Sequence, residues 1–95
     1  MVSTPYFRGR NREYRAMGTL KIKGWRCSRS AMSHGPVDIF AGKDGKMLLI
    51  QVKSGKARMS KQEREKLIEW AKAFGAEAEI WYYSKNRGNT IEKIA

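Results

Sequence analysis

The fold is decided by one stretch of the chain, which reads Val37-Asp38-Ile39-Phe40-Ala41, then Gly42-Lys43-Asp44-Gly45, then Leu48-Leu49-Ile50-Gln51-Val52-Lys53. Two apolar runs joined by a turn with two glycines predict a β-hairpin. Its strands carry polar side chains only at Asp38, Gln51 and Lys53. Because side chains alternate along a strand, Gln51 and Lys53 share one face with Leu49. A strand buried on both faces has no place for them unless this end of the hairpin opens onto a cleft.

Composition describes one small, strongly basic domain that spans residues 1–95. The chain has 20 Lys and Arg residues against 9 Asp and Glu residues, which gives a net charge of +11. A surplus of this size favours a polyanionic partner, and nucleic acid is the first choice because each neutralised phosphate releases counterions. The chain has no apolar stretch long enough to span a bilayer and no signal sequence, so we expect an intracellular protein without a membrane partner.

The rest of the chain predicts an α/β fold. The expected elements are a flexible lead 1–7, helix 8–23, strand 25–29 with Trp25 and Cys27 inward, the hairpin, helix 61–74 opened by a Ser60/Glu63 capping box, strand 78–83 and a short strand 90–94. The apolar stripe of the second helix is expected at Leu67, Ala71 and Phe74. Helix, three strands, helix, one or two strands predicts a mixed β-sheet flanked by helices.

Metal-dependent phosphodiester hydrolysis is the chemistry that suits the hairpin residues. It needs oxygen ligands for a cation and often a positive group near the attacking water. Asp38 offers a carboxylate, Gln51 an amide oxygen and Val52 a backbone carbonyl. Lys53 lies on the face of Gln51 and could orient the water or stabilise developing charge. Glu13 on the first helix is either a further ligand or an ion-paired surface residue.

Other chemistries find little support in the sequence. His34 is the single histidine and Cys27 the single cysteine, so neither belongs to a recognisable zinc site or catalytic triad. The simplest interpretation is a solvated loop histidine and a small core cysteine. The glycines do not have the spacing of a nucleotide-binding loop, so we expect no nucleotide cofactor.

A family resemblance joins these motifs. In chain order they are Arg8-Gly9, Glu13 on a helix, Arg29-Ser30 ending a strand, Val37-Asp38-Ile39, Ile50-Gln51-Val52-Lys53-Ser54, and Gln62 opening a helix that ends Phe74-Gly75. This order, from Arg8 to about Tyr83, resembles the PD-(D/E)xK nuclease superfamily and, within it, the archaeal-type Holliday junction resolvases. The resemblance implies a restriction-endonuclease-like fold. It also implies a homodimeric, Mg²⁺-dependent endonuclease, with Mn²⁺ able to substitute, that grips a four-way DNA junction and nicks two strands symmetrically.

The resemblance also implies residue roles. Glu13, Asp38 and Gln51 would supply metal-site oxygens, Lys53 would be the catalytic lysine, and Ser30 would lie near the scissile phosphate. Gln62 would support Lys53, and Arg8 and Arg29 would contact phosphates. From their positions in basic segments, Arg10, Lys56 and Arg58 are further candidates for DNA binding. Two positions depart from the family: Gln51 stands where a Glu is usual, and Val37 separates Pro36 from Asp38.

Two alternatives remain open at this point. One is a nuclease of the same fold that acts on flaps, ends or duplex DNA, and the other is a catalytically silent DNA-binding module in which Gln51 marks a degraded site. Retention of Asp38 and Lys53 favours an active site, because a buried charge without a partner or a function is costly.

A homodimer is also expected from the aromatic residues. Trp81, Tyr82 and Tyr83 place aromatic rings on both faces of a late strand, and Trp70 flanks the stripe of the second helix. This is more apolar surface than a small monomer readily hides. Core packing is the alternative explanation for part of it.

Overall fold

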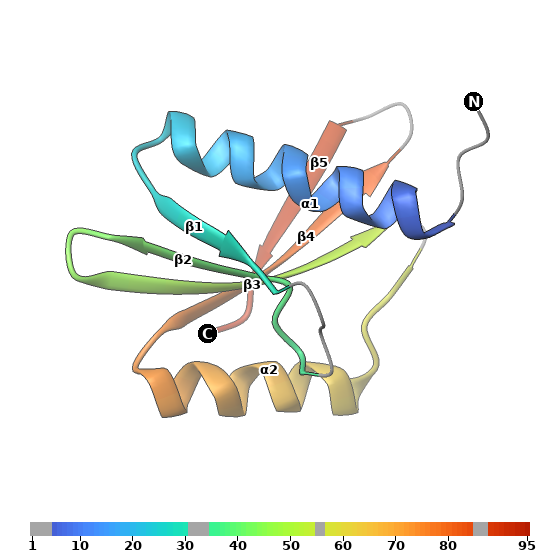
Figure 1. The fold of residues 1–95 in the computed structure, drawn as a ribbon. Helices are drawn as coiled ribbons and strands as arrows, with labels where there is room; N and C mark the ends of the chain where they lie inside the picture. The colour runs from blue at the N-terminus through green and yellow to red at the C-terminus, as the bar shows by residue number, and fades with distance from the viewer. Residues whose placement is uncertain (1–4, 31–34, 55–56, 85–87) are drawn as a thin grey trace.

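The protein is described by a computed structural model that covers residues 5–30, 35–54, 57–84 and 88–95, with residues 5–10 represented by their backbone alone. A five-stranded sheet lies between two helices (Figure 1). The elements are α1 (Pro5–Ile22), β1 (Arg26–Arg29), β2 (Ile39–Lys43), β3 (Lys46–Ser54), α2 (Lys61–Phe74), β4 (Glu77–Ser84) and β5 (Gly88–Lys93). This order of helix, three strands, helix and two strands confirms the expected α/β fold.

The sheet is mixed because one of its pairings is parallel. The strands lie in the order β1-β2-β3-β4-β5, and β3 pairs with β4 in parallel while the other neighbours are antiparallel. Parallel neighbours need a crossover connection, and α2 provides it across one face of the sheet. Figure 1 shows α1 over the opposite face.

The core has two layers, one on each face of the sheet. One buried cluster joins Ala16 and Leu20 of α1 to the sheet, and the other joins Leu67 and Ala71 of α2 to it. The alternation predicted for β3 is confirmed, because Leu48 and Ile50 belong to the α1 layer and Leu49 to the α2 layer. The face of β3 that carries Gln51 and Lys53 is therefore the face toward α2.

The hairpin turn is tighter than the sequence suggested. β2 runs to Lys43 and β3 begins at Lys46, so only Asp44 and Gly45 form the turn. Their φ angles are 51° and 77°. Two residues with positive φ make the type I′ turn, whose twist matches that of the flanking strands. Gly42, expected in the turn, instead pairs with Met47 in the ladder.

Both ends of α1 differ from the helix expected over residues 8–23. The helix begins at Pro5, so the expected flexible lead is wrong for residues 5–7, while residues 1–4 lie outside the described residues. Proline suits a first helical turn because its φ is already helical and its missing N–H is not needed there. At the other end the helix stops at Ile22, before Gly24 with φ of 91°.

α2 follows the sequence prediction at its start and departs from it in its last turn. Ser60 caps the helix, the Ser60/Glu63 capping box is present, and Gly75 ends the helix with φ of 64°. Leu67 and Ala71 are buried as expected, but Phe74 is 49% exposed. Its ring instead meets the edge of Phe40, with centroids 6.0 Å apart.

The dimer is expected partly because a small monomer does not readily bury the aromatic residues of β4, and the structure shows that this reason is wrong. Trp81, Tyr82 and Tyr83 are all buried within a single chain, with exposures of 2%, 7% and 7%. The two layers absorb them because β4 is covered on both faces. A partner subunit is therefore not needed to hide these three rings. Within the described part of the chain, neither helix is long and apolar enough to cross a membrane.

Candidate active site

β3 extends beyond the first residue of β2, so the last residues of β3 have no β2 neighbour, which leaves a gap at this edge of the sheet. Ile39 is the first residue of β2 and pairs with Ile50, whereas β3 runs on beside β4 to Ser54. Asp38 bridges the start of this gap, since its N–H donates to the Ile50 carbonyl at 2.9 Å. Its carboxylate Oδ2 accepts the N–H of Val52 at 2.8 Å. Because the N–H and C=O of one strand residue point to the same side, the Val52 carbonyl faces the edge where Asp38 lies.

Asp38 carries a carboxylate that burial makes hard to ionise. Several influences, of which desolvation is the largest, together raise its pKa from 3.8 to about 6. The Val52 N–H lowers the pKa, the charge of Glu13 raises it further, and the charges of Lys53 and Arg29 lower it. Burial prevails over the surrounding donors and cations, so an additional cation at this carboxylate would be favoured electrostatically.

Glu13 and Arg29 join α1 to the end of β1. Arg29 Nη1 donates to Glu13 Oε1 at 3.1 Å, and both side chains are largely buried, with exposures of 15% and 18%. The guanidinium also lies over the ring of Tyr14, 5.4 Å from its centroid. The hydrogen bond to Glu13 raises the pKa of Arg29. In this arrangement Arg29 neutralises Glu13 beside Asp38, and its expected contact with a phosphate stays a prediction.

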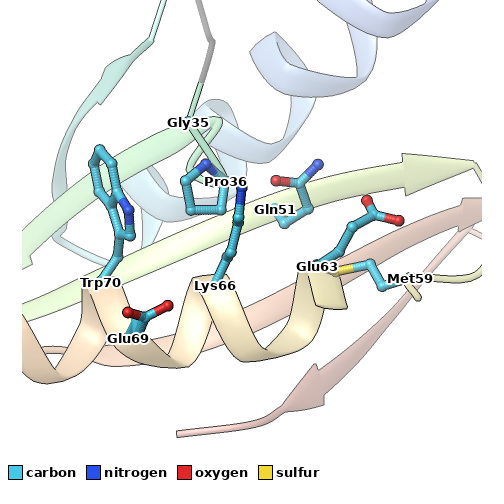
Figure 2. A pocket seen from close by; sticks show the side chains of 8 residues that line it. All are labelled: Gly35, Pro36, Gln51, Met59, Glu63, Lys66, Glu69 and Trp70. Carbon is cyan, nitrogen blue, oxygen red and sulfur yellow. The ribbon is translucent and has the colours of Figure 1, made fainter. Parts of the chain in front are cut away.

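Lys53 contacts α2 on the opposite side of the gap. Its Nζ donates to Oε2 of Glu63 at 3.0 Å. Glu63 also lines a pocket of about 420 Å³ with Gln51, between α2 and the segment that enters β2. Figure 2 shows Gln51 and Glu63 at one end of this pocket and Trp70 at the other. The remaining lining residues are Gly35, Pro36, Met59, Lys66 and Glu69.

Few oxygen atoms at the end of β3 are available to a metal ion. No three His, Cys, Asp or Glu side chains converge to form a metal site within the ranges that the structure describes. The available set is the Asp38 carboxylate and the Val52 carbonyl on one edge, with the Gln51 amide one residue away on β3. Mg²⁺ usually takes one or two carboxylates and keeps several waters, so this set suits it.

The remaining predicted residues are distributed unevenly around this gap. Ser30 is linked to Asp38, because its N–H donates to the Asp38 carbonyl at 2.8 Å. Arg58 is exposed, with its guanidinium 5.8 Å from the centroid of Tyr82. Gln62 is exposed in the first turn of α2, and Lys53 donates to Glu63, the residue that follows Gln62. Arg8 and Arg10 lie on α1 with undescribed side chains, and Lys56 and His34 lie outside the described residues.

Glu63 has a contact with Lys53 that the sequence did not predict, because its position in the S-x-x-E motif indicated only a helix cap. A capping box uses one carboxylate oxygen of its Glu and leaves the second available. The sequence therefore indicated that Glu63 has one oxygen free for another donor. It could not indicate which lysine is that donor, because this depends on how α2 packs on β3. The tertiary contact with Lys53 spans 10 residues of sequence and has no local pattern.

A sequence profile for the archaeal Holliday junction resolvases (Hjc) matches residues 4–93. The chain therefore belongs to the archaeal Holliday junction resolvase family. Membership of this family implies that the protein is a nuclease.

Similarity to a solved structure agrees with the profile. The 1.6 Å structure of Archaeoglobus fulgidus Hjc, a Holliday junction resolvase from an archaeal hyperthermophile, shares 29% sequence identity with this chain and has a TM-score of 0.79. The similarity covers 92% of this chain and 73% of the Archaeoglobus chain. Among curated proteins, none matches this sequence.

The half-buried position of Asp38 predicts a pH-dependent gain of stability when it is replaced by Asn. Asn keeps an oxygen for the Val52 N–H but carries no charge, so it avoids the desolvation cost. The pKa of Asp38 is about 6 in the folded chain and near 3.8 when unfolded, so the cost is present above pH 6 and vanishes as the pH falls below 3.8. At pH 8 without divalent cations, Asp38→Asn should raise the free energy of unfolding by up to about 3 kcal/mol.

Urea unfolding in EDTA at pH 8 and at pH 3.5 measures this gain, with exposed Asp44→Asn as the control. An equal effect of Asp38→Asn at both pH values would contradict the assignment of burial as the dominant influence on Asp38.

Proposed function

We propose that the protein is a Mg²⁺-dependent endodeoxyribonuclease that resolves four-way (Holliday) DNA junctions by paired nicks, with Mn²⁺ able to substitute. The observation that carries the proposal is the half-buried Asp38, held on the Val52 N–H at the open end of β3, with the charge of Lys53 near enough to lower its pKa. Family membership supports this function, and an intracellular location follows from a DNA substrate.

Each residue of the gap has a chemical role in this proposal. When bound, Mg²⁺ polarises the scissile phosphate and helps to ionise the attacking water. Asp38, the Val52 carbonyl and Gln51 would hold the ion, and Glu13 would contact it through water while paired with Arg29. Lys53 orients the water or stabilises charge on the phosphate. Ser30, whose N–H donates to the Asp38 carbonyl, would contact the scissile phosphate.

Affinity for DNA comes from a wider basic surface. The net charge of +11 supplies a sequence-independent attraction to phosphates. Arg58 is exposed and belongs to this surface, and Arg8, Arg10 and Lys56 are proposed to join it. Arg29 would act on DNA only indirectly, through its neutralisation of Glu13. Gln62, exposed at the start of α2, would support the lysine region from outside.

Two alternative functions differ from this one in the DNA that is cleaved or in whether DNA is cleaved at all. A flap, end or duplex nuclease of the same fold would cleave another DNA structure better than a four-way junction. A silent DNA-binding module would bind junctions without cleavage. Incubation of labelled junction, flap and plain duplex DNA with Mg²⁺ or with EDTA distinguishes them. The proposal requires paired nicks in the junction that depend on Mg²⁺.

Cleavage and DNA binding should separate in two single variants. Asp38→Ala and Lys53→Ala should each abolish Mg²⁺-dependent cleavage, because the first removes a metal ligand and the second removes the group that assists the water. Junction affinity should persist, because it depends on the basic surface. Gel-shift titration and a nicking assay measure the two properties, with Lys72→Ala as an exposed control. Unchanged cleavage in either variant would remove that residue from the active site.

Gln51 should set the metal requirement. Its amide presents a dipole where the family usually has a full charge, so Gln51→Glu should shift the Mg²⁺ dependence of nicking to lower concentration. Gln51→Leu should weaken or abolish cleavage. Nicking rates are titrated with Mg²⁺ for the three proteins at one salt concentration, since DNA affinity falls steeply with salt. Superimposable titrations would refute Gln51 as a ligand.

A homodimer is part of the proposal, and we propose that α2 carries its contact surface. Trp70 and Phe74 are 38% and 49% exposed and their rings lie 6.0 Å apart. Adjacent exposed aromatic rings are typical of protein interfaces. Trp70→Ser/Phe74→Ser should therefore convert a dimer into a monomer in sedimentation at micromolar concentration. Ile22→Ser, at an 89% exposed site on α1, is the matched control. A monomeric unmodified protein would refute the dimer.

A further inference from the structure

The carboxylate of Glu63 is divided between two partners. Oε1 accepts the N–H of Ser60 at 3.1 Å, and Oε2 accepts Nζ of Lys53 at 3.0 Å. The first contact belongs to the capping box at the start of α2, and the second reaches β3. One side chain therefore connects the first turn of a helix to the lysine at the open end of the sheet.

The helix start fixes this carboxylate firmly. The N–H of Glu63 donates to Oγ of Ser60 at 3.1 Å, so Ser60 and Glu63 hold each other reciprocally. α2 itself is anchored by Leu67, which is fully buried against the sheet. A carboxylate held at both its backbone and one oxygen offers its second oxygen from a defined position.

Lys53 needs such an anchor because its side chain is long. A lysine loses up to about 2 kcal/mol of rotamer entropy when it is held in one conformation, so an unsupported ammonium samples many positions. Its side chain is only 23% exposed, and that of Glu63 is 45% exposed. The ammonium contacts Glu63, and Glu63 lines the pocket together with Gln51.

We infer that Glu63 is the positioning residue for Lys53, holding the ammonium at the open end of β3 through the capped start of α2. The inference rests on the proposed function, because it assigns how the proposed catalytic lysine is oriented. Glu63 does not contact the reacting atoms in this assignment. Misplacement of a catalytic group by about 1 Å can slow a reaction by about 100-fold, so loss of the Glu63 bond should be visible in the cleavage rate.

The two contacts of Glu63 can be separated by substitution. Glu63→Gln keeps one carbonyl oxygen for the Ser60 N–H, and Gln is an accepted partner in a capping box. Its amide nitrogen is a donor and cannot accept from Lys53. Ser60→Ala is the matched control, because it removes the cap hydroxyl and leaves both oxygens of Glu63. Glu63→Ala, a second variant, removes both contacts of the carboxylate but keeps the Glu63 N–H bond to Ser60 Oγ, so comparison with Ser60→Ala separates loss of the carboxylate from loss of the cap hydroxyl.

The measurement is single-turnover cleavage of a four-way junction at saturating protein, with junction affinity, Mg²⁺ midpoint and melting temperature measured in parallel. Glu63→Gln and Glu63→Ala should slow cleavage by about 10- to 100-fold. Their junction affinity and Mg²⁺ midpoint should be unchanged, because neither DNA contacts nor metal ligands are altered. Ser60→Ala should lower the melting temperature and keep the cleavage rate.

Combination with Lys53→Met tests whether Glu63 acts through the lysine. Adding Glu63→Gln to Lys53→Met should cause no further loss, because residues that act as a unit are not additive. Normal cleavage by Glu63→Gln and Glu63→Ala with inactive Lys53→Met overturns this inference alone. Equal losses in Ser60→Ala and Glu63→Ala also overturn it, in favour of a helix cap. Normal cleavage by Lys53→Met overturns both this inference and the catalytic role of Lys53.

Discussion

The site depends on one hydrogen bond, from the N–H of Val52 to the carboxylate of Asp38. β2 begins at Ile39, opposite Ile50, and does not extend as far as Val52, so a side chain takes the place of a backbone acceptor there. That substitution leaves a carboxylate at the open end of a strand, with the carbonyl of Val52 on the same edge. It also holds Asp38 in a half-buried place, where several influences, of which desolvation is the largest, together raise its pKa to about 6.

Charges from both layers of the fold converge on this gap. Glu13 and Arg29 approach from α1 and β1, and Lys53 and Glu63 connect β3 to α2. The two helices therefore do more than cover the sheet, because each brings one carboxylate to a basic residue beside Asp38. A shift of either helix would change the electrostatic environment of the same buried carboxylate.

Local sequence patterns predicted those features that are themselves local. Alternation along β3 placed Leu49 and Leu48 on opposite faces, and the spacing of Ser60 and Glu63 predicted the start of α2. The tertiary ion pairs were not predictable in this way, because Glu13 meets Arg29 and Lys53 meets Glu63 only after the helices dock. Aromatic composition likewise did not distinguish the buried Trp81 from the exposed Trp70, since both occur in apolar stretches. The metal and catalytic roles, inferred from the residue types and from the family resemblance, remain predictions.

The central claim is that the end of β3 holds a divalent cation between Asp38 and the Val52 carbonyl. A crystal structure with Mn²⁺, analysed by anomalous scattering, tests it most directly. The account predicts an anomalous peak bonded to a carboxylate oxygen of Asp38 and to the carbonyl oxygen of Val52, and its loss in Asp38→Ala. A Mn²⁺ peak elsewhere, or a peak that survives in Asp38→Ala, would contradict it.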